Sequence, residues 1–157
     1  MSSLYRAFVA ILILTSFVSA QDSIPLVCHD NGVQVIALAG TNVPNGTYGL
    51  GASFANNIVG RIQGSDDISL NYNRFHTSTG GGIFVKEVNQ GVGALRAALL
   101  NYTTACPNTP IVIHGYSEGG CVVMNTICGG AYPWTSPAAL PASYANNSMG
   151  IVIFQHD

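Results

Sequence analysis

The sequence predicts an α/β fold in which a central parallel sheet lies between two layers of helices. Short apolar runs alternate along the chain with longer segments of helical periodicity, and this β–α–β order predicts parallel strands with helices on both faces. Sites in such sheets lie at the carboxyl ends of the strands, so the loops after Ala39 and His114 should meet there. We expect strands near residues 33–39, 68–72, 111–114 and 151–154, and helices near 53–62, 84–104 and 118–128.

The first half of the chain supplies two strands and one helix. Residues 33–39 are mostly apolar, as in a strand covered on both faces, and the turn-forming residues 40–46 end this strand. The helix at 53–62 carries an apolar residue at every fourth position, which predicts one buried stripe. Residues 68–72 alternate between apolar and polar side chains and predict a second strand, which follows a turn at 64–67.

The second half begins with the clearest periodic segment, the helix at 84–104, which follows a polar, glycine-rich loop at 74–82. Its apolar residues are three or four positions apart over about five turns and therefore predict core packing. They are Phe84, Val88, Val92, Leu95, Leu99 and Tyr102. A strand at 111–114 and a helix at 118–128 come next, and the proline-rich segment 132–141 separates them from the last strand.

Composition places the chain among globular, secreted proteins. Of its 157 residues 48% are hydrophobic and 8% are charged, and the net charge is −2, which argues against disorder and against binding of nucleic acid. Residues 1–20 predict a secretory signal peptide, because Arg6 precedes a short apolar core and small residues precede a cleavage site after Ala20. The alternative, a retained membrane anchor, needs a longer core of about 20 residues.

We therefore expect the mature chain, residues 21–157, to be an extracellular monomer without a membrane segment. Sequons for N-glycosylation fit a secreted surface and begin at Asn45, Asn101 and Asn146.

Four cysteines in a secreted chain predict disulfides, and they allow three connectivities. These cysteines are Cys28, Cys106, Cys121 and Cys128. The last two lie on one predicted helix, which separates their Cα atoms by about 10 Å, beyond the roughly 7 Å that a disulfide can span. We expect no metal site, because the sequence has no Cys-x-x-Cys motif and no close cysteine–histidine pair.

The strand at 111–114 leads into a Gly-x-Ser-x-Gly motif centred on Ser117, and a helical segment follows. Strand, tight turn and helix form the setting in which this motif presents a nucleophilic serine for acyl transfer. Gly115 and Gly119 are required because a side chain at either position would collide with the neighbouring strand or helix. The alternative, a chance match in a glycine-rich chain, does not account for the strand and helix on either side.

Acyl transfer also needs hydrogen-bond donors for the developing oxyanion. The backbone N–H of Glu118 opens the helix after the serine and predicts one donor. Thr41, which follows the first strand and a glycine, predicts a second donor through its N–H and its hydroxyl.

From Cys28 to Phe154 the sequence resembles the cutinase and acetylxylan esterase family of secreted fungal serine esterases. The residues around Ser117 resemble the family's nucleophile turn, which usually ends Gly-Tyr-Ser-Gln-Gly, and Gly40-Thr41 resembles its oxyanion loop. The segment 127–130 is closer to the acetylxylan esterase branch, in which the cysteine at this point pairs with one nearer the C-terminus. The resemblance implies an α/β-hydrolase-like fold and a disulfide between Cys28 and Cys106.

The resemblance also implies a function. It predicts a cofactor-free esterase that hydrolyses acetyl esters of plant cell-wall polysaccharide, such as acetylxylan, through an acyl-enzyme at Ser117. A polyester hydrolase acting on cutin is the neighbouring alternative. A second alternative is a catalytically inactive pseudoenzyme that binds a polysaccharide or a protein.

Three departures from the family pattern affect these expectations. Glu118 replaces the usual glutamine, and a carboxylate about 7 Å from an oxyanion would oppose it by about 2 kcal/mol unless its side chain points to solvent. The segment 155–157 is Gln-His-Asp where the family usually has Gly-Asp-Pro. The family's triad aspartate and histidine lie beyond Asp157, so we expect a C-terminally truncated, incomplete domain that is inactive as it stands.

The sequence offers two other sources of a base. His156 and Asp157 are adjacent on an extended chain, so their side chains point in opposite directions and cannot both line up with one serine. A rearranged triad would use His29, His76 or His114. Of these, His114 lies in the strand before Ser117 and is expected to be a packed strand residue.

Overall fold

The computed structural model describes residues 26–75, 81–129, 138–147 and 150–154. The predicted signal peptide, His76, His156 and Asp157 lie outside these ranges. Within them, no helix is both long enough and apolar enough to span a membrane.

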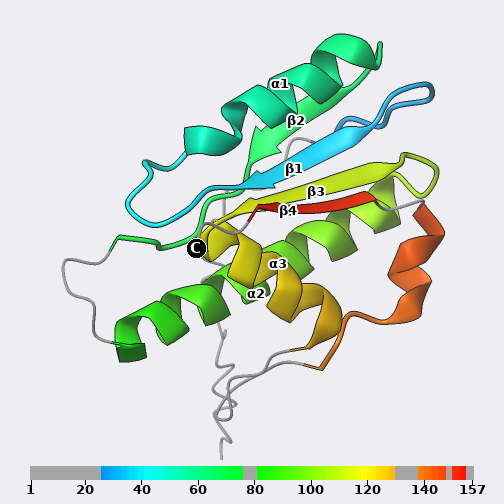
Figure 1. Ribbon diagram of the computed structural model, residues 1–157. Coiled ribbons are helices and arrows are strands. Elements are labelled where there is room, and N and C mark those ends of the chain that lie inside the picture. The colour runs from blue at the N-terminus through cyan, green and yellow to red at the C-terminus, as the bar shows by residue number, and fades with distance from the viewer. Residues whose placement is uncertain (1–25, 76–80, 130–137, 148–149, 155–157) are drawn as a thin grey trace, which may run out of the picture.

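The described residues form a four-stranded sheet in the order β2-β1-β3-β4, and all its strands are parallel. β1 (Gln34–Leu38) and β3 (Ile111–Tyr116) are the inner strands, and β2 (Asp66–Ser69) and β4 (Gly150–Phe154) flank them (Figure 1). β1 is buried along its whole length. The predicted α/β fold with a parallel sheet is confirmed.

Helices cover both faces of this sheet (Figure 1). α1 (Ala52–Arg61) lies on one face, directly after the short 3-10 helix η1 (Gly49–Gly51). α2 (Gly81–Ala105) and α3 (Glu118–Cys128) pack side by side on the other face. A second 3-10 helix, η2 (Ala142–Asn147), precedes β4.

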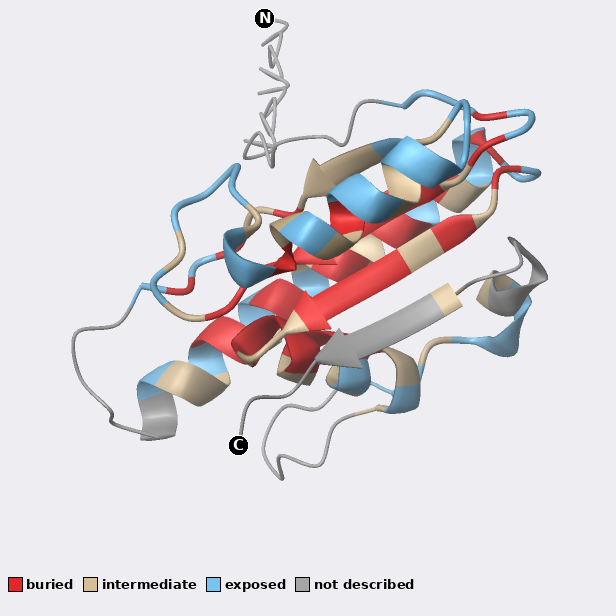
Figure 2. Ribbon diagram, turned by 45° about the horizontal axis from the view of Figure 1, so that its top comes forward, coloured by how far each residue is buried: buried red, intermediate tan, exposed pale blue. Residues whose placement is uncertain are grey.

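The core lies between the sheet and the α2–α3 layer. The predicted apolar stripe of α2 is buried, except that Phe84 is only partly covered. The stripe packs against apolar side chains of the inner strands and of α3, which include Ile36, Leu38, Ile111, Ile113, Val122 and Val123. Figure 2 shows most of both inner strands in the colour of buried residues. β1 is buried along its length, and β3 is buried except at Val112 and Tyr116. The loops after β1 and β3 therefore leave strands that the core holds in place.

The predicted position of β2 in the sequence was wrong. The strand lies at 66–69 instead of 68–72, and Asp66 and Asp67, expected in a turn, pair with Gln34 and Val35. An edge strand accepts such residues because one of its sides is unpaired and its carboxylates can reach water. Leu70, beyond the strand, still donates its N–H to the carbonyl of Ala37 at 2.8 Å, so the extended chain continues along β1.

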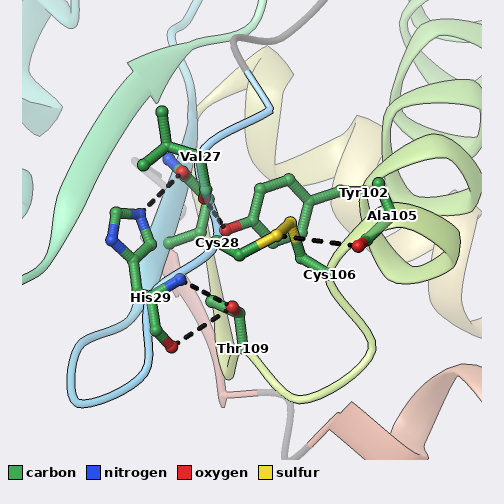
Figure 3. Close-up of a disulfide and its surroundings, with 8 residues drawn as sticks. Val27, Cys28, His29, Tyr102, Ala105, Cys106 and Thr109 are labelled. Carbon is green, nitrogen blue, oxygen red and sulfur yellow. Dashed lines mark hydrogen bonds between the residues drawn. A yellow bond between two sulfur atoms is a disulfide. The ribbon is translucent and has the colours of Figure 1, made fainter.

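A disulfide joins Cys28 to Cys106 near the amino ends of the strands, as the family resemblance implied (Figure 3). Tyr102 supports it by donating its hydroxyl to the carbonyl of Val27 at 2.7 Å. The disulfide therefore ties the segment before β1 to the end of α2. Both cysteines of α3 are unbridged in this structure, Cys121 half-buried and Cys128 exposed.

Candidate active site

Ser117 lies between β3 and α3 in a backbone conformation that non-glycine residues rarely adopt. Its φ is 52° and its ψ is −120°, a geometry that costs on the order of 1–3 kcal/mol. Its carbonyl accepts the N–H groups of Gly120 and Cys121 at 2.8 and 3.2 Å, so α3 starts directly from the turn. The predicted strand, tight turn and helix are confirmed, and they place a half-buried serine at the carboxyl end of β3.

Close packing explains the glycines around this turn. A Cβ atom on Gly115 would lie 2.6 Å from the carbonyl oxygen of Gly119 in α3. A Cβ atom on Gly119 would collide with the carbonyl oxygen of Leu38 in β1. A Cβ atom on Gly40 would lie 3.0 Å from the Cβ atom of Ser117. The loop after β1 therefore lies directly against the serine turn.

Thr41 and Glu118, the two predicted oxyanion residues, are in contact. The Thr41 hydroxyl donates to a carboxylate oxygen of Glu118 at 2.7 Å. Glu118 is only 1% exposed, so the alternative in which its side chain points to solvent is wrong. The carboxylate lies in the first turn of α3, where the helix dipole favours negative charge. The structure therefore gives the Thr41 hydroxyl an acceptor within the protein.

Tyr72 and Arg74, which follow β2 in the sequence, hold the loop that carries Thr41. The sequence analysis did not predict a role for either residue. Tyr72 donates its hydroxyl to the carbonyl of Ala39 at 2.6 Å. Arg74 donates to the carbonyls of Val43 and Pro44 at 2.6 and 2.9 Å. The sequence analysis placed Arg74 in a polar loop. Arg74 is one of only five lysines and arginines in the chain, and this rarity was the available signal that it has a specific role.

The Glu118 carboxylate contributes to the pKa shifts of three neighbouring groups. Burial raises the pKa of the Tyr72 phenol, and the negative charge of Glu118 raises it further. Burial and Glu118 also raise the pKa of the Cys121 thiol, which favours the unreactive, protonated form. Burial lowers the pKa of the Arg74 guanidinium, and Tyr72 and Glu118 oppose that change.

His114 is packed in β3, as predicted, and is 1% exposed. Its ring stacks on Phe54 of α1, with 4.7 Å between the ring centroids. A Cβ atom on Gly51 would lie 2.5 Å from Cε1 of His114, so η1 also lies against the ring. Burial lowers the pKa of His114. The ring faces α1, whereas Ser117 opens α3 on the other face of the sheet.

His29 lies at the amino end of the sheet. Its backbone N–H donates to the Thr109 hydroxyl at 2.8 Å (Figure 3). Its Nε2 lies 3.4 Å from Oε1 of Gln34, the first residue of β1. Strands of this length separate that end from Ser117 by roughly 15–20 Å. Among the described residues, no group of three histidine, cysteine or acidic side chains is arranged to hold a metal ion.

Comparison with known proteins places this geometry in a family. The sequence profile of the family described as Cutinase matches residues 27–156. The chain is 32% identical to acetylxylan esterase 2 of Talaromyces purpureogenus over 115 residues, which cover 70% of this chain and 49% of that protein. It is 34% identical to cutinase 11 of Verticillium dahliae over 88 residues, which cover 55% of this chain and 30% of that protein.

A solved acetylxylan esterase structure superposes on this chain with a TM-score of 0.70 and 28% sequence identity. The match covers 81% of this chain and 63% of that structure. The chain thus spans about half, or less, of the length of these curated relatives. Because the family profile covers most of the sequence and the fold agrees with it, this chain belongs to the cutinase family.

Proposed function

We propose that the protein is a secreted serine esterase that removes acetyl groups from plant cell-wall polysaccharide such as acetylxylan. The observation that carries this proposal is the Ser117 turn, with Thr41 and the first residue of α3 beside it. The similarity to proteins named acetylxylan esterases supports the substrate class. The conformational cost of the turn at Ser117 is typical of functional sites.

In the proposed reaction, the Ser117 hydroxyl attacks the ester carbonyl while a base takes its proton. The resulting oxyanion accepts hydrogen bonds from the N–H of Glu118, at the positive end of α3, and from Thr41. The intermediate collapses, the carbon–oxygen bond to the sugar breaks, and the sugar hydroxyl leaves with the proton. Water then attacks the acetyl-serine, releases acetate and restores Ser117.

The base is the component that the described residues do not supply. His29 lies at the other end of the sheet and His114 packs against α1. We expect full activity to require a histidine and an aspartate in addition to the described residues.

Hydrolysis of longer, apolar esters such as cutin is a second candidate function. Leu50 is 73% exposed and Phe75 is 50% exposed. They belong to the segments that follow β1 and β2, which leave the sheet at the carboxyl ends of the strands, the end at which Ser117 also lies. Exposed apolar side chains near a serine turn would favour an acyl chain over an acetyl group.

A non-catalytic binding protein is a third candidate, and the bond between Thr41 and Glu118 favours it. An acidic side chain buried at the expected oxyanion site works against the proposed chemistry. In this interpretation the domain retains the fold and binds polysaccharide or protein without turnover.

Expression of residues 21–157 with an oxidised Cys28–Cys106 pair tests these functions. Acetate release from acetylxylan that is lost in Ser117→Ala would support the acetyl esterase. A higher kcat/KM for 4-nitrophenyl decanoate than for 4-nitrophenyl acetate would support the polyester hydrolase instead. If the chain gives no Ser117-dependent turnover and Ser117 is not labelled by diethyl 4-nitrophenyl phosphate, the binding protein becomes the better description.

A further inference from the structure

We propose that Arg74 is a positioning residue of the oxyanion site, which fixes the loop carrying Thr41 from outside the catalytic turn. This inference rests on the proposed esterase function, in which Thr41 lies beside the reacting carbonyl. Arg74 follows β2 in the sequence and takes no part in the proposed reaction. Its role is to hold the backbone of the loop that carries Thr41 through hydrogen bonds.

The bonds of Arg74 surround the residues that follow Thr41. The Arg74 carbonyl accepts the N–H of Asn42 at 2.8 Å. Nε of Arg74 donates to the carbonyl of Val43 at 2.6 Å, and a terminal amino group donates to that of Pro44 at 2.9 Å. Arg74 is thus hydrogen-bonded to three successive loop residues. These bonds fix the backbone next to Thr41, whose side chain points toward α3 and donates to Glu118.

Tyr72 completes this support on the other side of Thr41. Its hydroxyl donates to the carbonyl of Ala39, two residues before Thr41, at 2.6 Å. Its ring also faces the Arg74 guanidinium, whose central carbon lies 5.1 Å from the ring centroid. The two side chains therefore act as one support, and Thr41 lies between the backbone groups they hold.

The loop turns at Thr41 and Asn42, where Asn42 has a φ of 59°, in the left-handed region. Asparagine enters that region more readily than other side-chain-bearing residues, but at a cost relative to glycine. Without its bonds to Arg74, the segment would be free to relax, and the Thr41 N–H would move. A displacement of about 1 Å in a positioned group can cost about 100-fold in rate.

The chemistry of position 74 is specific to arginine. The side chain is 0% exposed, so carbonyl acceptors and the aromatic face of Tyr72, in place of water, stabilise its positive charge. A lysine would keep the charge, but its single ammonium group lacks the planar fork that reaches neighbouring carbonyls together. Arg74→Lys thus separates geometry from charge.

The test compares Arg74→Lys and Arg74→Gln with the wild-type chain, and with Arg61→Lys at the exposed end of α1 as the matched control. Three properties are measured: kcat and KM for 4-nitrophenyl acetate, amide hydrogen exchange of residues 39–47, and urea unfolding. We expect Arg74→Lys to lower kcat at least tenfold with KM within twofold. We also expect faster exchange confined to residues 39–47, and a larger effect of both kinds in Arg74→Gln.

A wild-type kcat in Arg74→Lys would overturn the proposal, as would exchange that rises equally in β1 and β3, because Arg74 would then only stabilise the fold. If Arg74→Gln does not fold, Arg74→Lys alone decides. If the wild-type chain shows no Ser117-dependent turnover, the esterase function fails separately and exchange decides. Faster amide hydrogen exchange confined to residues 39–47 in Arg74→Lys would then support the positioning role, and unchanged exchange would overturn it.

Discussion

The hydroxyl of Thr41 donates to the carboxylate of Glu118 at 2.7 Å and joins the loop after β1 to the first turn of α3. A threonine hydroxyl carries one proton, and an ionised carboxylate can only accept. While the Thr41 hydroxyl donates to Glu118, it cannot also donate to a substrate oxyanion. The oxyanion must then be stabilised by backbone N–H groups alone. Glu118 therefore weakens the proposed site twice, by engaging a donor and by placing negative charge beside it.

Replacement of Glu118 by glutamine should raise kcat by up to about 30-fold, which corresponds to the roughly 2 kcal/mol by which a carboxylate about 7 Å away opposes an oxyanion. The glutamine amide can donate to the Thr41 oxygen, so the hydroxyl proton can turn toward the substrate. The measurement is Ser117-dependent hydrolysis of 4-nitrophenyl acetate.

Asp30→Asn is the charge-matched control for this experiment. Asp30 is exposed near the amino ends of the strands, so removing its charge should leave kcat unchanged. A clear fall in kcat in Glu118→Gln would mean that the carboxylate assists the reaction, and the proposed oxyanion arrangement would have to be abandoned.

The same bond should contribute to stability. Thr41→Val keeps the shape of the side chain but removes the hydroxyl donor from a buried carboxylate, which should lower the free energy of unfolding by about 1–3 kcal/mol. Thr41→Ser retains the hydroxyl and should unfold close to the wild type. Urea unfolding at neutral pH checks both variants, and equal stability of Thr41→Val and the wild type would show that the bond is absent in solution.

Local periodicity was sufficient to predict most of the scaffold. The stripe of α2 and the apolar runs of β1 and β3 each encode their own burial, because a residue's neighbours three, four or two positions away share its face. The turn at Ser117 was also predictable, since the motif and its flanking elements are contiguous in the sequence. β2 was misplaced because an edge strand lacks the apolar signal of an inner one.

The electrostatic part of the site could not be predicted in this way. Whether Glu118 faces solvent or Thr41 depends on a loop 77 residues away in the sequence. The role of Arg74 depends on carbonyl groups of Val43 and Pro44, which approach it only because β1 and β2 are neighbours in the sheet. Such contacts follow from tertiary structure and leave no periodic pattern in one sequence.

Loss of the Cys28–Cys106 disulfide should be strongly destabilising. The bridge joins residues 78 positions apart, and closing a loop of that length restricts the unfolded chain by about 4.5 kcal/mol in the chain-entropy description. The double substitution Cys28→Ser and Cys106→Ser should lower the free energy of unfolding by about that amount. Cys128→Ser, at an exposed cysteine, is the control and should change stability by less than about 0.5 kcal/mol.

The burial of His114 predicts a pH dependence of stability. Its folded-state pKa is lowered below the ordinary value of 6.5 by burial, so the unfolded chain binds the proton first as the pH falls. The contribution of this group is complete above pH 6.5 and is lost as the pH falls from there toward the folded-state pKa, with a slope of up to about 1.4 kcal/mol per pH unit.

His114→Phe tests this directly, because it keeps an aromatic ring against Phe54 and removes the titrating group. Other groups also titrate in this range, so the quantity to follow is the difference in unfolding free energy between the variant and the wild type, measured by urea at several values between about pH 5 and 8. We expect the wild type to lose stability relative to the variant as the solution is acidified. A difference that does not change with pH would mean that His114 is protonated equally in both states, and the enclosed ring between α1 and β3 would then have to open in solution.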